Sequence, residues 1–178
     1  MELEEAYRLL NLSVQMIPEG SPNRNGRRMI PDHVTIHNTA NRSAGATAEM
    51  HARYLEGESA WTRKVSWHYT VDDTRAIKHL PVFEEGMHAG TREGNRRSVG
   101  IEICEFRGID QASANERAAL LTAVLLFVMQ WPIEAVVPHR YWSGKNCPHL
   151  LLADGEKGWK EFVVQVERFL TEFAGTGK

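Results

Sequence analysis

The sequence predicts an α/β fold in which a mixed central β-sheet is flanked by helices within one domain. Three short segments, 33–38, 66–72 and 98–104, alternate apolar and polar residues as half-buried strands do. Two longer segments in the C-terminal half carry apolar residues at helical spacing. Because strands alternate with helices and one hairpin is expected, we predict a mixed sheet covered by helices rather than a purely parallel sheet.

The strand expected at 33–38 has the sequence HVTIHN, which places Val34 and Ile36 on one face and His37 on the other. In the segment 98–104, Glu102 faces away from three apolar neighbours, Val99, Ile101 and Ile103. The segments WHYTVDD and RAIKHLP are expected to form a hairpin across residues 72–74. The sheet can therefore hold a carboxylate and an imidazole away from its apolar face.

Helical spacing predicts three helices. The first spans 47–56 and ends at Gly57, and the longest spans 113–131, before Pro132. A last helix carries an apolar stripe from Trp159 to Phe173, and residues 173–178 are expected to begin a linker. The apolar stripes of the two longer helices indicate packing against the sheet, and neither stripe resembles a cofactor-binding segment.

The composition is that of an ordinary folded domain. A chain of 178 residues can bury a core without disulfides, so one domain over 1–178 is expected. A net charge of −2 without a basic run favours neither a nucleic-acid nor a membrane partner. The N-terminal segment is too acidic and amphipathic for a secretory signal, and no later stretch is expected to span a bilayer. We expect a monomer that is made in the cytoplasm.

Three separated residues, His37, His139 and Cys147, form a candidate metal-ligand set. Two imidazoles and one thiolate are a ligand set of catalytic zinc sites, because three protein ligands leave a fourth position open. The turn at Ser143 and Gly144 can fold the thiolate back toward His139. A histidine alone is more often a satisfied structural residue than a ligand.

The other histidines and the second cysteine have simpler interpretations. His51 is expected on a helix surface, and His79 is expected to be an ordinary residue of the hairpin. Cys104 lies in an apolar strand and is expected to be a small buried side chain. A Cys104–Cys147 disulfide is the alternative to a metal-binding Cys147.

Five motifs, IHNTAN, SWHYTVDD, EEGMHAG, GNRRSVGIEICE and HRYWSGKNCP, occur in this order. Together they resemble the zinc-dependent N-acetylmuramoyl-L-alanine amidases of the type 2 class, in the peptidoglycan-recognition-protein-like superfamily. The resemblance runs from about residue 30 to 152 and is greatest to catalytic domains of phage endolysins and autolysins. It implies Zn2+-dependent hydrolysis of the amide between N-acetylmuramic acid and L-alanine in bacterial peptidoglycan, which lyses the cell wall.

The same motifs suggest roles for residues near the expected metal. Glu102, in the SVGIE context, is our candidate general base, and Lys145 is the candidate for stabilising the oxyanion. We expect Asn38, His68 and His88 to line the cleft, where they bind substrate or orient a zinc ligand. Release by lysis or through a holin pore would bring such a protein to the wall.

One position departs from the pattern. Some type 2 amidases have a tyrosine where this chain has Trp67, so the role of that tyrosine cannot be carried over. Tyr69 is expected on the same face as Trp67 and is interpreted as packing. The departure places more of the chemistry on Glu102.

Two alternative functions remain open on the sequence. A non-catalytic peptidoglycan-binding module would keep the groove and lose the thiolate, and Cys147 argues against that loss. A zinc peptidase would cut within the stem peptide, and no HExxH helix is present in the sequence.

Overall fold

Six strands form one sheet in the computed structural model, which describes residues 1–175. Their spatial order is β1-β4-β3-β5-β2-β6, and only β3 and β4 run antiparallel to each other. The predicted mixed sheet is therefore confirmed. The strands are β1 (Leu12–Val14), β2 (His33–Asn38), β3 (Tyr69–Val71), β4 (Ala76–Lys78), β5 (Ser98–Ile103) and β6 (Val136–Pro138).

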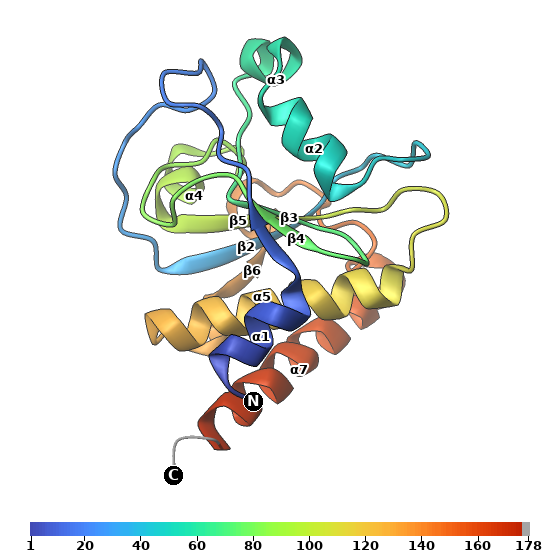
Figure 1. Ribbon diagram of the computed structural model, residues 1–178. Helices are drawn as coiled ribbons and strands as arrows, with labels where there is room; N and C mark the ends of the chain where they lie inside the picture. The colour runs from blue at the N-terminus through green and yellow to red at the C-terminus, as the bar shows by residue number, and fades with distance from the viewer. Residues whose placement is uncertain (176–178) are drawn as a thin grey trace.

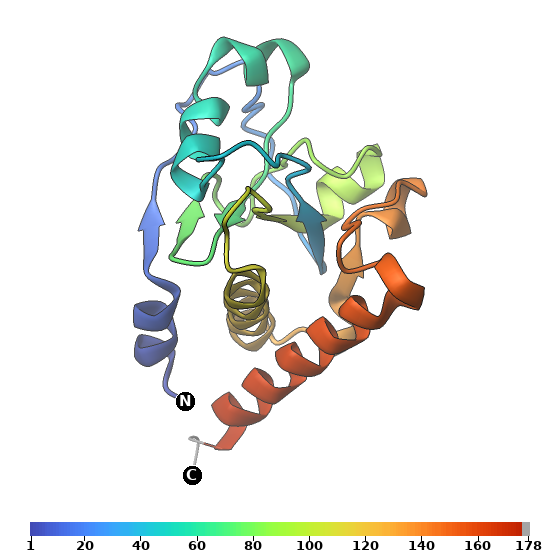
Figure 2. The ribbon, with the colours of Figure 1, turned by 90° about the vertical axis from the view of Figure 1, so that its right-hand side faces the viewer.

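Helices cover both faces of the sheet (Figures 1 and 2). On one face lie α1 (Leu3–Leu10), α5 (Gln111–Met129) and α7 (Ala153–Gly175). On the other face, α2 (Ala48–Leu55) packs over β3 and β4 and is followed by α3 (Glu58–Arg63). Shorter helices lie in the connections: α4 (Arg92–Arg97), the 3-10 helix η1 (Ile133–Ala135) and α6 (Arg140–Ser143).

The main core lies between the sheet and α5. Val34, Ile36 and Ile101 point from β2 and β5 into this core, as the alternation predicted. The helix α5 contacts β3 and β5 on one side and α1 and α7 on others, so nearly its whole circumference is apolar. The apolar stripe predicted over residues 113–131 included Val128, and that part of the prediction was wrong, because Val128 is 52% exposed.

The same burial explains a second difference from the sequence analysis. Residues 111–129 are long and apolar enough to span a bilayer by length and composition, contrary to our expectation for this region. More than half of that window is buried inside the fold, between the sheet and α7. A core helix enclosed on several sides reaches the same hydropathy as a membrane segment.

The opposite face of the sheet carries two smaller clusters. Trp67, Leu55 and Leu80 pack in one of them, whereas Tyr69 belongs to the main core. The expectation that Trp67 and Tyr69 share a face was wrong, because the regular strand begins only at Tyr69. His51, expected on a helix surface, is only 5% exposed because α2 lies directly on β3 and β4.

The first and last helices are joined at their ends. The amino group of Met1 donates a hydrogen bond to the Glu172 carbonyl oxygen (2.8 Å), and Phe173 is buried. The expected linker at 173–178 overlaps the end of α7, and residues 176–178 lie outside the described part of the chain.

Candidate metal centre and active-site groove

Parallel neighbouring strands bring the candidate ligands to one edge of the sheet. His37 lies near the end of β2, and the chain leaves β6 directly into His139, whose amide donates to the Ile36 carbonyl oxygen (3.2 Å). After α6, Gly144 adopts a left-handed φ of 73° and the loop returns to Cys147. The Arg140 amide closes this loop on the Cys147 carbonyl oxygen (3.0 Å). The reversal predicted at Ser143 and Gly144 is confirmed.

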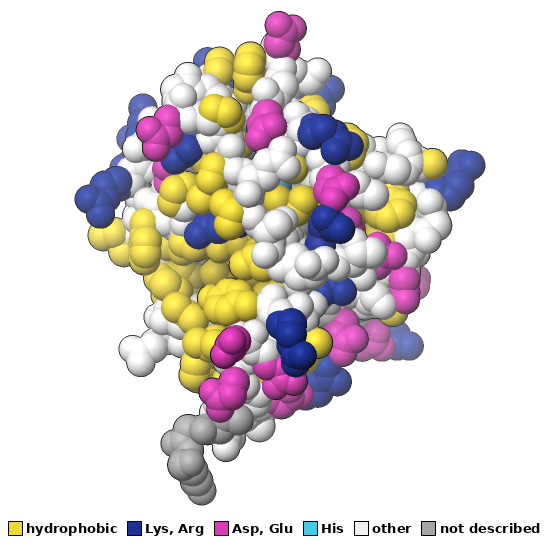
Figure 3. All heavy atoms as spheres, viewed as in Figure 1, with side chains coloured by type: hydrophobic (Ala, Val, Ile, Leu, Met, Phe, Trp, Pro, Cys, Tyr) yellow, Lys and Arg dark blue, Asp and Glu magenta, His cyan; other side chains and the backbone are white. Residues whose placement is uncertain are grey.

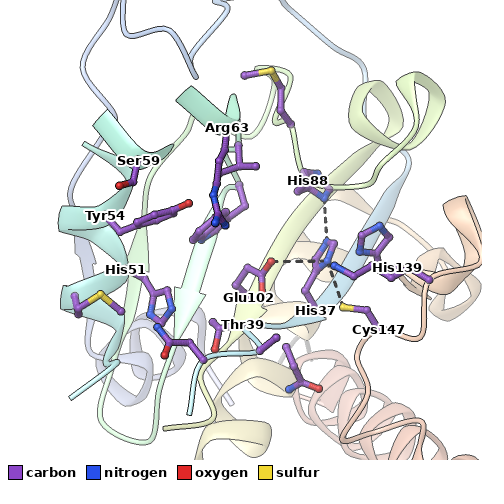
Figure 4. Close-up of a pocket in the computed structure, with 18 of the residues that line it drawn as sticks. His37, Thr39, His51, Tyr54, Ser59, Arg63, His88, Glu102, His139 and Cys147 are labelled. Carbon is purple, nitrogen blue, oxygen red and sulfur yellow. Dashed lines mark hydrogen bonds and ion pairs between the residues drawn. The ribbon is translucent and has the colours of Figure 1, made fainter. Parts of the chain in front are cut away.

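The loop geometry gathers the three predicted ligands (Figure 4). The donor atoms of His37, His139 and Cys147 all lie within 4.8 Å of one another, and all three residues are buried. No other such group of three occurs among residues 1–175. Both cysteines are free, which removes the disulfide alternative. This cluster can hold a metal ion.

A chain of hydrogen bonds fixes the tautomer of His37. The Ser98 carbonyl oxygen only accepts hydrogen bonds, so Nε2 of His88, 3.2 Å away, carries the proton. The Nδ1 atom of His88 must then accept from Nε2 of His37 (3.0 Å). His37 is left with an unprotonated Nδ1 that lies 3.7 Å from the Cys147 sulfur. Its free lone pair therefore faces the other ligands.

Burial keeps the two imidazoles of the cluster in the neutral form that a metal site needs. It lowers the pKa of His37 well below the usual value, and the nearby His88, His139 and Lys145 lower it further. Burial likewise lowers the pKa of His139 and raises the pKa of the Cys147 thiol to about 12. The imidazoles are therefore neutral, while the thiol needs a neighbouring cation to ionise.

Unpartnered polar atoms show that this cluster fits a cation. Both ring nitrogens of His139 are buried, and neither has a hydrogen bond of normal geometry among the described residues, although the Ala89 backbone lies close enough to raise the pKa of the ring slightly. Buried polar atoms without partners are costly, which indicates a missing partner. Together with the His37 lone pair and the Cys147 sulfur, they make a donor set that accepts a metal ion.

Glu102 stands beside the cluster on β5. Its carboxylate oxygen Oε1 lies 3.8 Å from Nδ1 of His37, and Oε2 is buried without a hydrogen-bond partner in the described chain. Burial raises the pKa of Glu102 to about 8, an effect that Lys145 opposes and Glu105 reinforces. Without a cation beside it, this carboxyl group is largely protonated at neutral pH, and a bound metal ion would favour its carboxylate form.

The cluster forms one wall of an open groove of about 850 Å³. Glu102, Asn38, His88 and the exposed Lys145 also line this groove. The opposite wall comes from α2, α3 and the chain that follows them (Figure 4), with side chains that include Met50, His51, Tyr54, Glu58, Arg63 and Trp67.

The structure does not bring His68 to the groove. Its Nε2 donates to the Glu84 carbonyl oxygen (2.8 Å), and its Nδ1 accepts from the Gly100 amide (3.0 Å). Both ring nitrogens are therefore used, and the residue is fully buried. Asn38 lines the groove, but its Oδ1 accepts from the Leu150 amide (3.1 Å), which leaves Nδ2 free.

Two glycines that the sequence analysis did not single out make room for the histidines. A Cβ at Gly100 would lie 2.7 Å from Nδ1 of His88, and one at Gly86 would lie 3.0 Å from the His68 ring. The Gly100 contact is closer than real Cβ atoms show, and the Gly86 contact is tighter than nine in ten real Cβ contacts. A glycine inside the apolar strand VGIEI was the available signal, because glycine in a strand often marks a close approach.

A buried network also supports the far wall of the groove. The Trp67 indole donates to Oγ1 of Thr70 (2.7 Å), which in turn bonds Nε2 of His79 (2.8 Å). Nδ1 of His79 bonds the Gln15 carbonyl oxygen (3.1 Å), which fixes the direction of the chain of donors. The orientation of Trp67 at the groove is thus set by groups reaching back to the N-terminal segment.

Residues 26–150, which contain the whole ligand cluster, match the family of N-acetylmuramoyl-L-alanine amidases. The chain belongs to this family. It is 47% identical over 146 residues to the N-acetylmuramoyl-L-alanine amidase XlyA of Bacillus subtilis (strain 168), which covers 81% of this chain and 48% of XlyA. It is 42% identical over 147 residues to CwlH of the same organism, which covers 81% of this chain and 58% of CwlH.

The matched part thus corresponds to about half the length of these two curated amidases. A solved structure of the catalytic domain of XlyA superposes with a TM-score of 0.80 at 44% identity. That comparison covers 88% of this chain and 99% of the XlyA domain. The six-stranded mixed sheet with its flanking helices is therefore the fold of this amidase family.

Proposed function

We propose that the chain is a zinc-dependent N-acetylmuramoyl-L-alanine amidase that hydrolyses the amide between N-acetylmuramic acid and L-alanine in bacterial peptidoglycan. The observation that carries the proposal is the convergence of His37, His139 and Cys147 beside Glu102 on the wall of an open groove. Membership of the amidase family supports the choice of reaction.

Zinc is the metal that these residues fit best. Two neutral imidazoles and one thiolate suit Zn2+, and three ligands leave a position open to water or substrate. When bound, zinc would polarise the scissile carbonyl and lower the pKa of water. We assign His37, His139 and Cys147 to holding it, and His88 to orienting His37 through the hydrogen bond at 3.0 Å.

Glu102 and Lys145 supply the proton transfer and the electrostatic stabilisation. The Glu102 carboxylate, whose Oε1 lies 3.8 Å from Nδ1 of His37, takes the proton of the attacking water and returns it to the leaving amine. Lys145 is exposed at the groove on the loop that ends at Cys147, so its ammonium can approach the carbonyl oxygen as negative charge develops there.

The shape of the groove supports a polymeric substrate. It is an open groove rather than an enclosed cavity, and its two walls differ in character. The metal side carries the reacting groups, whereas the α2–α3 side offers Tyr54, Glu58 and Arg63. We propose that the second wall contacts the stem peptide or the glycan, while Asn38 lines the groove near the scissile amide.

We further propose that the protein is made in the cytoplasm and reaches the wall after lysis or through a holin pore. The likeness to a solved endolysin structure from Bacillus subtilis (43% identity, TM-score 0.82) supports the release step of this proposal. Residues 3–10 of this chain form an amphipathic helix packed on α5. Ala6 and Leu10 of that helix are fully buried, so the segment is part of the folded protein.

The test is to digest purified peptidoglycan with the metal-depleted protein and with the zinc-restored protein. The proposal expects new L-alanine amino termini and intact glycan strands only with the restored protein. New reducing ends would indicate a glycosidase, and amino termini of other residues would indicate a stem peptidase. Wall binding without any new ends would indicate a non-catalytic module. Any of these three results would overturn the proposal.

A further inference from the structure

A second hollow, of about 920 Å³, lies away from the metal centre. It shares no lining residue with the active-site groove. We call it the Ile30–Phe83 patch and define it by its lining residues, which are Arg28, Met29, Ile30, Phe83, Arg92, Glu93, Arg96 and Arg97. These residues come from a loop, from the connection after β4 and from α4.

Two large apolar side chains of the patch are held out in solvent. Ile30 is 89% exposed and Phe83 is 51% exposed. The backbone beneath them is fixed, because the Met29 amide donates to the Phe83 carbonyl oxygen (2.8 Å) and the Glu85 amide donates to the Arg27 carbonyl oxygen (2.8 Å). The side chain of Met29 is buried in the main core and anchors the loop. The exposure is therefore built into the fold.

The patch also carries unpaired positive charge. Arg28, Arg92 and Arg96 are exposed and have no ion pair or side-chain hydrogen bond in the described part of the protein. Only Arg97 is neutralised, by Asp32 (2.6 Å) and Glu93 (2.7 Å). Figure 3 shows hydrophobic side chains beside Lys and Arg side chains at its left edge, over the region of α4 and the preceding loop in Figure 1.

We propose that the Ile30–Phe83 patch binds the surface of an anionic phospholipid bilayer. Exposed apolar side chains surrounded by arginines suit an interface at which acyl chains meet charged headgroups. A symmetric contact between two copies of the chain would bring the same unpaired arginines together and is disfavoured by repulsion. A soluble polyanion would satisfy the arginines but leave Ile30 and Phe83 in water.

This proposal departs from the expectation that the protein has no membrane partner. That expectation rested on the absence of a basic run, whereas the fold assembles this patch from residues 28–30, 83 and 92–97. Such binding would concentrate the protein beside the layers of wall nearest the membrane. It does not depend on the metal centre, so its failure would leave the proposed amidase activity untouched.

The test measures co-sedimentation of the intact chain with vesicles of phosphatidylglycerol and with vesicles of phosphatidylcholine. We expect salt-sensitive binding to the anionic vesicles and none to the zwitterionic ones. Replacing Arg28, Arg92 and Arg96 by glutamine should weaken binding on the order of a hundredfold, because each arginine near such a surface contributes roughly fivefold in affinity. A variant with Ile30→Ser and Phe83→Ser should also bind more weakly, and its residual binding should be more sensitive to salt.

A control variant replaces the same types of side chain on other surfaces of the protein. Val164→Ser with Arg107→Gln removes an exposed apolar side chain and an exposed arginine from other surfaces and should bind as wild type does. Absence of wild-type binding to anionic vesicles would overturn the proposal. Equal binding by wild type and the Ile30/Phe83 variant would also overturn it. So would tight binding to soluble polyphosphate that is unchanged when Ile30 and Phe83 are replaced. All variants should keep their hydrolysis of soluble muropeptides.

Discussion

His37 and Glu102 occupy directly paired positions on the adjacent parallel strands β2 and β5, and their side chains approach to 3.8 Å. Paired residues of neighbouring strands project to the same face of a sheet, so the backbone itself holds the carboxylate beside the candidate ligand. The relationship requires no loop and no bound ion. It places the Glu102 side chain beside the candidate ligand His37 through the register of the two strands.

We predict that Glu102→Gln lowers the rate of peptidoglycan hydrolysis on the order of a hundredfold or more while the protein keeps its zinc and its fold. Glutamine preserves the shape of the side chain but cannot take the proton. The measurement combines zinc content per chain with the rate at which new L-alanine termini appear. Glu105→Gln, which removes a nearby buried carboxylate paired with Arg42, is the control and should keep most of the activity. Turnover of Glu102→Gln close to that of the control would contradict the assignment.

Lys145→Ala should lose activity on a similar scale, because an oxyanion would lose its nearest cation. Lys145→Arg keeps the charge and should recover part of the rate. The side chain is exposed, so neither variant should alter the free energy of unfolding measurably. A rate for the alanine variant equal to that of Lys160→Ala, which changes an exposed lysine on α7 outside the groove, would show that the ammonium takes no part.

The sequence predicted the parts of the site that depend on alternation and motif spacing. The strand at 33–38 has the predicted bounds, and Glu102 faces away from Val99 and Ile101 as expected. The three candidate ligands meet because His37 ends a parallel strand and Gly144 reverses the loop before Cys147. The strand bounds, the direction of Glu102 and the loop reversal are local features that a local pattern can predict. The meeting of His37 with the two later ligands is a long-range feature, and it was expected from the family resemblance.

Other features arise only from tertiary packing. The strands β1 and β6 contain three residues each, too few to show an alternating pattern. His51 became buried because α2 lies on the sheet. Trp67 and Tyr69 lie on different faces because the chain bends at His68, before the regular strand begins at Tyr69. No sequence motif predicted the second wall of the groove, which α2 and α3 form.

Cys147→Ser should bind zinc much more weakly than wild type, because a hydroxyl is a poor substitute for a thiolate ligand. Competition with a chromophoric chelator measures this affinity, and inactivation by chelator with recovery on adding zinc should accompany it in wild type. Cys104→Ser is the matched control: that sulfur lies 3.7 Å from His51 in a separate cluster. Equal zinc affinity for the two serine variants would contradict the thiolate ligand.

His88→Ala should weaken zinc binding on the order of tenfold to a hundredfold, because it removes the acceptor that fixes the tautomer of His37. His88→Gln can both accept from His37 and donate to the Ser98 carbonyl, so it should recover part of the affinity. Gly100→Ala should resemble His88→Ala, since its Cβ would press on the His88 ring at 2.7 Å. The visible spectrum of the cobalt-substituted protein should shift in these variants and not in Gly175→Ala, whose Cβ meets nothing within 4 Å.

His79 should make the folded protein sensitive to mild acid independently of the metal. Burial lowers the pKa of His79 to about 4, with smaller opposing and reinforcing effects from Gln15, His51 and His68. Because the folded-state pKa lies below the unfolded value, the unfolded chain binds more protons as the pH falls. The stabilisation is complete above the unfolded value of 6.5 and is lost as the pH falls toward 4.

The loss approaches about 1.4 kcal/mol for each pH unit in the middle of this window for one such histidine. Urea unfolding of the metal-free protein at about pH 7 and about pH 5 measures it as a difference in the free energy of unfolding. His79→Gln removes the titrating ring and its bonds to Thr70 and Gln15, so it should be less stable than wild type at neutral pH yet lose less stability on acidification. If the variant loses as much stability between the two pH values as wild type does, His79 is not the source of the acid sensitivity.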